Sequence, residues 1–142
     1  VGKGLTGIAW GENLTTDQKQ VTKKLFDRTS KIYEFTEDYL DIFLALTSSG
    51  PAIIALIIES LSDGGLSGGL SKKLSEELVM EMIVGTISLI KEQNLTTSEL
   101  KNLVTSPGGT TISALRVLEK KSIRSALIES IVSASNRSKE FS

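Results

Sequence analysis

Eight residues near the C-terminal end of the sequence, Val104 to Thr111, combine the features of a small anion-binding site. They read V-T-S-P-G-G-T-T. Pro107 disfavours helix at the residue before it, the two glycines carry no Cβ, and the two threonines stand where a new helix is expected to begin. Because the first N–H groups of a helix lack partners and the helix dipole adds partial positive charge, the octet predicts a site for an anion, with threonine hydroxyls as further donors.

The same octet also fits a plain corner between two helices, with Thr110 or Thr111 as the N-cap of the second helix. Residue chemistry alone leaves both interpretations open, and nothing in the octet names a ligand.

The composition excludes most familiar hydrolytic chemistry. The 142-residue sequence has no cysteine and no histidine. Disulfides, thiolate nucleophiles, zinc fingers and imidazole acid–base catalysis are therefore all absent. A chain of this length can fold as a single domain without such cross-links. No metal site is expected.

The charge pattern argues against nucleic acid as a partner. Sixteen basic and seventeen acidic residues leave a formal net charge of −1, without a basic stripe or an acidic run. The longest wholly apolar run, residues 51–58, is shorter than the roughly 20 residues that a membrane span needs. No charged-then-apolar leader opens the sequence, so we expect a cytoplasmic protein without a membrane partner.

The elements that must position the octet begin with a short strand–helix–strand unit. Residues 4–11 predict a strand, Thr15 and Gln18 form a capping box that starts a helix, and residues 31–36 predict a second strand. Two strands cannot make an independently stable sheet, so we expect further strands beside them.

From Asp38 onward the pattern predicts helices. Residues 38–46 form the first helix, residues 47–50 interrupt it, and Pro51 begins the next. Residues 52–58 of this second helix are apolar around its whole circumference, which predicts burial on every side. Because so small a chain has few segments to cover such a helix, we expect an obligate homodimer centred on residues 51–61 and the C-terminal helices.

The remaining helices are predicted from their starts. Ser71 is the expected N-cap of a long apolar helix, in which Gly85 suggests close approach of another helix. Thr96 and Glu99 form a second capping box, and Ser122 is the expected N-cap of the last helix.

Three weaker motifs favour structural explanations. Gly2, Gly4 and Gly7 spell the dinucleotide fingerprint GxGxxG, but that fingerprint needs a strand before it and only Val1 precedes it here, so a glycine-rich strand is the preferred interpretation. The glycine cluster at 64–69 fits a helix end and a tight turn. Glu59 and Asp63 fit solvated residues near that helix end better than a buried acid.

Taken together, these segments resemble the C-terminal part of pyrroline-5-carboxylate reductase. The strongest match is V-T-S-P-G-G-T-T-I-S-A-L at residues 104–115, supported by S-G-P-A at 49–52, E-S-L-S-D-G-G at 59–65 and R-S-K-E at 137–140. The segments keep the order and approximate spacing of that family, and the similarity extends over nearly the whole chain.

The resemblance implies a mainly α fold, with an all-helical dimerisation and substrate-binding domain at residues 38–142. Residues 1–37 would be a terminal βαβ remnant of a Rossmann-type sheet. It also implies NAD(P)H-dependent reduction of 1-pyrroline-5-carboxylate to L-proline by the complete enzyme, as a homodimer or a higher oligomer built from it. NADP or NAD would bind the rest of the Rossmann domain, and this chain alone would bind neither cofactor tightly.

The resemblance further implies roles for individual residues. The backbone of Gly108, Gly109 and Thr110 and the hydroxyl of Thr111 would bind the substrate carboxylate. A second segment would lie near the nicotinamide: Thr47, Ser48, Ser49 and Gly50. The catalytic proton donor is not indicated. The sequence departs from the family at Ser48, Lys121 and Ser122, which stand where glycines are usual, and at residues 94–96, where Glu-His-Pro is common.

Two classes of function remain open at this stage. The chain is either a fragment of the reductase, which its start at Val1 favours, or a stand-alone non-catalytic module for dimerisation or for binding a small carboxylate.

Overall fold

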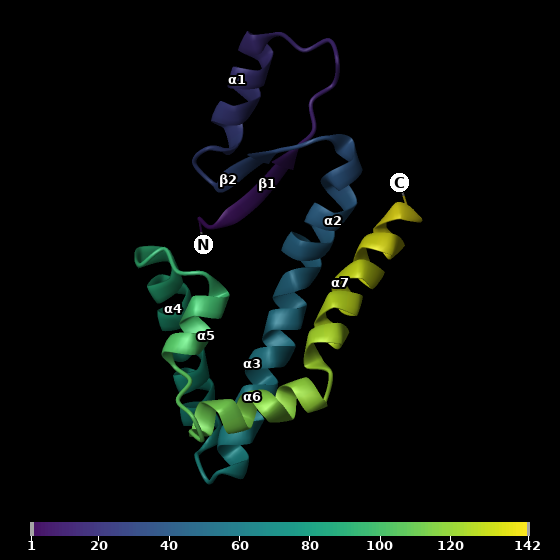
Figure 1. Cartoon of the computed structure of the whole chain (residues 1–142). Helices are drawn as coiled ribbons and strands as arrows, with labels where there is room; N and C mark the ends of the chain where they lie inside the picture. Colours follow the sequence, from purple (N-terminus) through teal and green to yellow (C-terminus); the bar gives the residue numbers. More distant parts are fainter. Residues whose placement is uncertain (1, 142) are drawn as a thin grey trace. The chain divides into compact units, whose positions relative to one another are not determined.

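A computed structural model describes residues 2–141, and its elements are mainly helical (Figure 1). The chain forms two compact units, which are considered separately below: residues up to 51 together with 128 onward, called the first unit, and residues 52–127, called the second unit. The predicted domain boundary at residue 37 stays a prediction.

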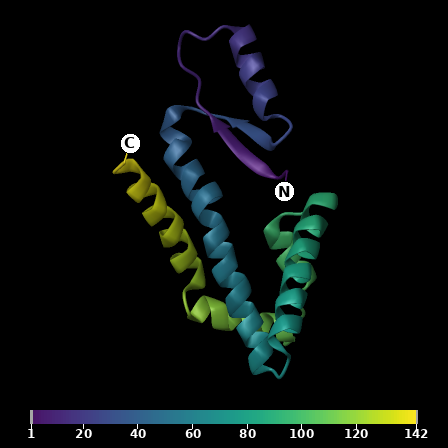
Figure 2. The ribbon, with the colours of Figure 1, turned by 180° about the vertical axis from the view of Figure 1, so that it is seen from behind.

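The first unit begins with two parallel strands joined by a helix, as the sequence predicted. Strand β1 (Gly4–Ile8) pairs in register with β2 (Ser30–Glu34), from Gly4 opposite Ser30 to Ile8 opposite Glu34. Helix α1 (Thr16–Phe26) connects them and lies on one side of the pair in both Figure 1 and Figure 2. The capping box of Thr15 and Gln18 is confirmed, so the first helix starts where local chemistry places it.

A small aromatic cluster joins the two strands to the following helix. The rings of Phe35 and Phe43 lie 5.1 Å apart between centroids, and Tyr33 lies 6.3 Å from Phe43. A Cβ on Gly7 would come within 2.7 Å of Phe35 and 2.9 Å of Phe43. Only glycine at this position lets the aromatic rings approach the strand so closely.

The predicted interruption at residues 47–50 is not a break. A 3₁₀ turn (Glu37–Tyr39), α2 (Leu40–Leu44), a π-helical turn (Ala45–Ser49) and α3 (Gly50–Ser67) follow one another as continuous helix. Pro51 has no N–H to donate and would crowd an ordinary helical turn, and the wider π turn before it relieves this conflict. The prediction of two separate helices was therefore wrong, while the sequence signal for an irregularity was real.

Because these turns and helices are continuous, the helical stretch Glu37–Ser67 is much longer than the apolar run at residues 51–58. By length and composition, Glu37–Ser67 could cross a membrane, and it is the one such stretch within residues 2–141. Only 6% of its most apolar window is buried. A helix that is apolar on all sides meets the same criterion when another protein chain covers it.

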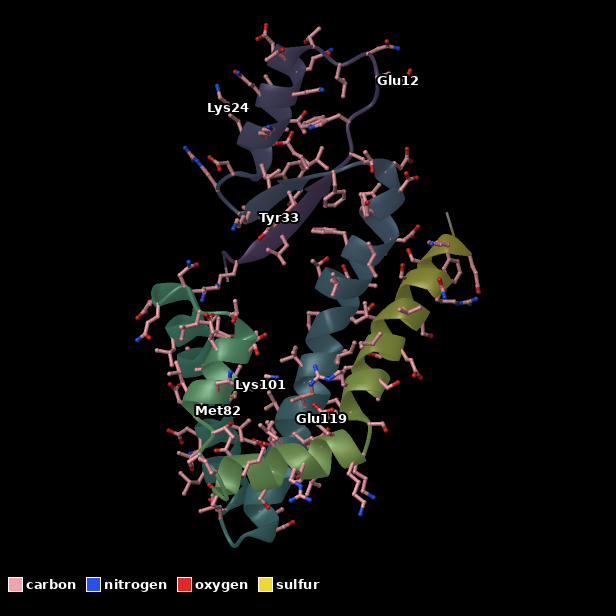
Figure 3. The ribbon with its side chains drawn as sticks, viewed as in Figure 1. Glu12, Lys24, Tyr33, Met82, Lys101 and Glu119 are labelled. Atoms are coloured by element: carbon pink, nitrogen blue, oxygen red, sulfur yellow. The ribbon has the colours of Figure 1, made fainter. Side chains whose placement is uncertain are left out.

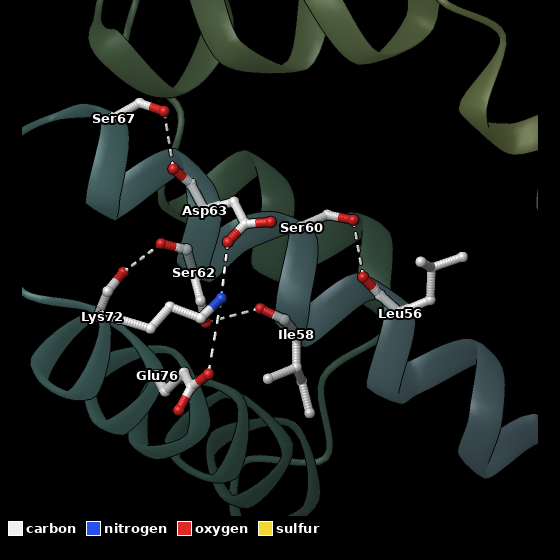
Figure 4. Close-up of polar contacts among 9 residues, drawn as sticks. Leu56, Ile58, Ser60, Ser62, Asp63, Ser67, Lys72 and Glu76 are labelled. Carbon is white, nitrogen blue, oxygen red and sulfur yellow. Dashed lines mark hydrogen bonds and ion pairs between the residues drawn. The ribbon is translucent and has the colours of Figure 1, made fainter.

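The second unit is organised by a close contact between α3 and α4 (Lys72–Glu92), drawn in Figure 4. Ser75 donates its hydroxyl to the Ser62 carbonyl at 2.6 Å, Ser62 donates to the Ile58 carbonyl at 2.7 Å, and both serines are buried. At the surface above them, Lys72 lies 2.6 Å from Asp63 and 3.6 Å from Glu76. Asp63 is thus a surface ion-pair residue, as the sequence favoured.

The glycine cluster at 64–69 forms the helix end and the tight turn that the sequence predicted. Gly69 is left-handed with φ of 99°, its N–H bonds to the Leu66 carbonyl, and the Leu70 N–H bonds to the Gly65 carbonyl. This pair of hydrogen bonds is the Schellman motif that ends many helices. The next residues start α4, where Ser71 is confirmed as the N-cap.

Two shorter helices and the last helix complete the chain. The second capping box, Thr96 with Glu99, is confirmed at the start of α5 (Thr97–Leu103). After α6 (Thr110–Lys120), Ser122 precedes α7 (Ile123–Lys139) with a left-handed φ of 55°. In the first unit, Ser138 near the end of α7 lies within hydrogen-bonding distance of Asp41 in α2, 2.5 Å between side-chain oxygens.

The α3–α4 contact gives a direct test of the fold. A methyl group added at Gly65 would overlap the Ser75 hydroxyl and lie 3.1 Å from its Cβ. We expect Gly65→Ala to lower the free energy of unfolding by about 1 to 3 kcal/mol, because overpacking must push the helices apart. Urea denaturation at a fixed protein concentration measures this.

The neighbouring glycine is a matched control, since a Cβ at Gly64 meets no described atom within 4 Å. Gly64→Ala should leave stability unchanged or raise it slightly. Adding Ser75→Gly to Gly65→Ala should restore part of the loss. Equal effects of the two alanine substitutions would show that the contact does not depend on Gly65.

Candidate functional site

The octet forms a tight turn between α5 and α6. Ser106 accepts a hydrogen bond at 3.1 Å from the Gly109 N–H, with Pro107 and Gly108 between them. Gly108 has a φ of 70°. Proline followed by a left-handed glycine inside such a bond is the arrangement of a type II turn.

Gly109 lies at the N-cap position of α6 in an extended conformation. The first N–H of the helix to bond within it is that of Ser113, which donates to the Gly109 carbonyl at 3.3 Å. The N–H groups of Thr110, Thr111 and Ile112 therefore occupy the first turn, where a helix leaves its donors without helical partners. Neither threonine is the N-cap, so that detail of the corner interpretation was wrong.

Caps distinguish this helix start from three others. The side chains of Thr15, Ser71 and Thr96 each accept a bond from a backbone N–H at the starts of α1, α4 and α5. Gly109 provides no such side chain. The start of α6 thus combines a positive dipole end with donors that no side chain of the N-cap residue engages.

The two glycines of the octet contribute in different ways. The Gly109 N–H is engaged by Ser106, so Gly109 is important mainly because it lacks a side chain. A Cβ there would overlap the Ser106 hydroxyl. Gly108 supplies the positive φ, which strains any other residue. The role of Ser106 in closing the turn was missed, although serine before Pro-Gly is a signal for it.

The second predicted segment, Thr47 to Gly50, forms the end of the π turn and the first residue of α3. Thr47 donates its hydroxyl to the Phe43 carbonyl at 2.7 Å, four residues earlier. A Cβ on Gly50 would meet nothing within 4 Å. This segment belongs to the first unit and the octet to the second, so the structure gathers each set of residues locally.

Charged side chains lie on α5, α6 and the start of α7 rather than in the turn. Arg124 donates to Glu119 at 2.5 Å between side-chain atoms, and this bond holds the pKa of the Glu119 carboxyl below its usual value. Lys101 of α5 adds a smaller effect in the same direction (Figure 3). Both partners of the ion pair are more than half exposed, so it contributes little to stability.

A shallow surface follows α6 and is not an enclosed cavity. Its lining comes from this one helix, between Ile112 and Lys120, and includes Leu115 and Val117. No group of three or more potential metal ligands was found among the described residues. The donors present at the start of α6 are backbone N–H groups and threonine hydroxyls, the groups that suit an anion.

A family model and individual relatives both match this chain to pyrroline-5-carboxylate reductases. A family model described as pyrroline-5-carboxylate reductase dimerisation matches residues 37–141. A pyrroline-5-carboxylate reductase of Synechocystis is 41% identical over 99% of this chain and 53% of its own length. The reductase of Methanosarcina acetivorans is 34% identical over 99% of this chain and 52% of its own.

Solved structures agree with the sequence relatives. A crystal structure of Plasmodium falciparum pyrroline carboxylate reductase with NADP bound is similar at a TM-score of 0.92 and 33% identity, covering 98% of this chain and 56% of that one. A pyrroline-5-carboxylate reductase of Coxiella burnetii is similar at a TM-score of 0.91 and 34% identity, covering 99% and 53%. The chain thus spans about half the length of the relatives it matches.

Proposed function

We propose that this chain, which belongs to the pyrroline-5-carboxylate reductase dimerisation family, is the dimer-forming and substrate-binding half of such a reductase. The complete enzyme would reduce the imine of 1-pyrroline-5-carboxylate to L-proline with NADPH or NADH. Relatives with this name match 99% or more of the chain, and that breadth supports the proposal.

The observation that carries the dimer is the apolar surface of the chain. Within residues 2–141, Ala45 is the one buried hydrophobic residue, at 1% exposure. Large apolar residues of α3 are exposed instead, Leu56 at 62% and Ile54 at 49%. Exposure on this scale is costly in water, so a second copy must cover these side chains.

A partner chain also accounts for the apolar stretch Glu37–Ser67 without a membrane. The family model that matches this stretch describes a dimerisation domain, and a homodimer gives the helix apolar surroundings. We therefore propose a cytoplasmic enzyme whose partners are its own copies and a small substrate. We propose no nucleic-acid partner, because acidic and basic residues are balanced and form no basic stripe.

We propose that the start of α6 binds the carboxylate of the substrate. A monoanion requires several aligned donors but no full positive charge, which suits backbone N–H groups and a hydroxyl. Thr110 and Thr111 would supply these donors, while Gly108 and Gly109 shape the turn and leave the approach open. The segment Thr47 to Gly50 would lie toward the nicotinamide.

The described residues do not fit a dinucleotide cofactor. Gly4 and Gly7 of the GxGxxG pattern lie inside strand β1, whereas the pyrophosphate site requires a glycine turn between a strand and a helix. We propose that NADP or NAD binds the other half of the complete enzyme. The NADP of the Plasmodium falciparum relative is consistent with this proposal.

The dimer can be tested with a matched pair of substitutions. The parent chain should sediment as a dimer at micromolar concentration. Leu56→Glu should raise the dimer dissociation constant at least about tenfold, because a charge replaces an apolar contact worth about 2 kcal/mol. Leu25→Glu in α1, at a residue that is 71% exposed and outside the matched family region, should leave it unchanged. A folded parent monomer would contradict the proposal.

We also expect the purified 142-residue chain to show no catalytic turnover of 1-pyrroline-5-carboxylate. Mixed with 1-pyrroline-5-carboxylate and NADPH, it should give no steady loss of NADPH absorbance, because it lacks a site for the dinucleotide. The same chain joined to the N-terminal half of the Synechocystis reductase should be active. Steady turnover by the chain alone would contradict the proposal that the cofactor binds the other half of the enzyme. A chimera that folds and dimerises but is inactive would favour a non-catalytic module.

The carboxylate site can be tested in that active chimera. Thr111→Val should lower kcat/KM about 5- to 150-fold, since losing one hydroxyl donor with little change of shape costs about 1 to 3 kcal/mol. Gly109→Val should be worse, because its side chain would collide with Ser106 as well as with the ligand. Thr22→Val in α1 is the matched control, because its hydroxyl bonds only to the Gln18 carbonyl of its own helix. If both octet variants kept the kcat/KM of the parent chimera, the turn would be only a corner between two helices and not a carboxylate site.

A further inference from the structure

Gly85 is a glycine in the middle of α4 that its own chain does not explain. A Cβ at this position would meet no described atom within 4 Å. Glycine inside a helix costs about 1 kcal/mol relative to alanine, because its backbone is freer in the unfolded chain. Other glycines have a visible reason within the chain: Gly7 makes room for Phe43, Gly65 for Ser75, and Gly109 for Ser106.

Large, apolar and exposed side chains precede Gly85 on its side of α4. Leu78 lies seven residues before it and Met82 three residues before it, which places both on the same side of the helix. Leu78 is 51% exposed and Met82 50%, and Leu74, one turn further, is 44% exposed. Met82 is labelled on α4 in Figure 3. We call these four residues, Leu74, Leu78, Met82 and Gly85, the α4 gap surface.

The α4 gap surface borders a different side of α4, the one that touches α3, and Met82, seven residues after Ser75, lies where the two sides meet. That other side includes Ser75, whose hydroxyl bonds to the Ser62 carbonyl. A glycine between apolar side chains leaves a gap in the helix surface, and such a gap lets the backbone of another helix come close. Exposed to water, the same gap would have no benefit to offset its helical cost.

We propose that a helix from a second copy of this chain crosses α4 at Gly85, with its backbone seated over the glycine and its side chains packed against Met82 and Leu78. The inference rests on the proposed dimer, which supplies the occupant. All of α4 lies within the matched dimerisation region, and both α4 and α3 expose large apolar side chains. In a two-fold symmetric dimer this contact occurs twice.

The test compares substitutions at Gly85 with the same substitutions at Gly64. Gly64 is also a helical glycine whose Cβ would meet nothing within 4 Å, and three of the four residues one turn from it are small, namely Ser60, Ser67 and Gly68, while the fourth is Leu61. Gly85→Ala and Gly85→Leu should raise the dimer dissociation constant progressively, the leucine by about 5- to 150-fold, because overpacked contacts cost about 1 to 3 kcal/mol. Gly64→Ala and Gly64→Leu should leave it at the parent value in sedimentation equilibrium.

A labelling experiment covers the case in which Gly85→Leu fails to fold. The chain has no cysteine, so Gly85→Cys and Gly64→Cys each carry a single thiol. In the native dimer the thiol at 85 should react with a maleimide at least about tenfold more slowly than the thiol at 64, since a covered site reacts only on local opening. Both should react equally after denaturation.

The possible failures are distinguishable. A dimeric parent whose Gly85 variants keep the parent dissociation constant and whose thiol at 85 labels as fast as that at 64 would overturn the crossing at Gly85 alone. A monomeric parent would overturn the proposed dimer itself. A raised melting temperature in Gly85→Ala, with unchanged association, would show that the position faces water.

Discussion

The main physical constraint on this chain is that its helices cannot cover one another. Only Ala45 is buried among the hydrophobic residues of positions 2–141, although 39% of the sequence is hydrophobic. Hydrophobic burial supplies most of the favourable free energy of folding, so a chain with so little burial cannot be stable by itself. Its folding free energy must come largely from association, and its apparent stability must rise with protein concentration.

The same constraint explains why the close contacts within the chain use small residues and hydrogen bonds instead of large apolar side chains. Where α3 meets α4, two buried serines and Gly65 replace large side chains, and their hydroxyls bond to backbone carbonyls. Hydrogen bonds of this kind fix the geometry of a corner without requiring much apolar area. The octet is held in the same local way, by the turn from Ser106 to Gly109. The candidate site is therefore set by backbone geometry and not by a surrounding core.

Sequence reasoning succeeded where the signal is local. A few adjacent residues account for both capping boxes, the cap at Ser71, the parallel strand–helix–strand unit and the start of a helix at the end of the octet. It failed at Ala45–Ser49, because proline usually marks the first turn of a helix and a π turn can accommodate it inside one.

Two other features could not be read from local pattern. Ser122 adopts a left-handed backbone at a position where the family usually has glycine, which gives that glycine a physical reason. Asn94 is left-handed too, as asparagine tolerates better than most residues. The spacing of apolar residues does not show which helix faces a second copy covers, since an apolar helix has the same sequence pattern whichever chain buries it. The roles of Thr47 to Gly50 and of Gly108 to Thr111 stay predictions.

The two-stranded sheet has a consequence for how such a chain survives synthesis. Among the described residues, β1 and β2 pair only with each other, so each strand keeps one edge of unpaired backbone groups. Open edges invite pairing between molecules and hence aggregation. Both strands are only five residues long, and β2 carries Lys31 and Glu34; short or charged edges are poor templates for such pairing. A newly made chain therefore carries some protection against aggregation before its proper neighbours arrive.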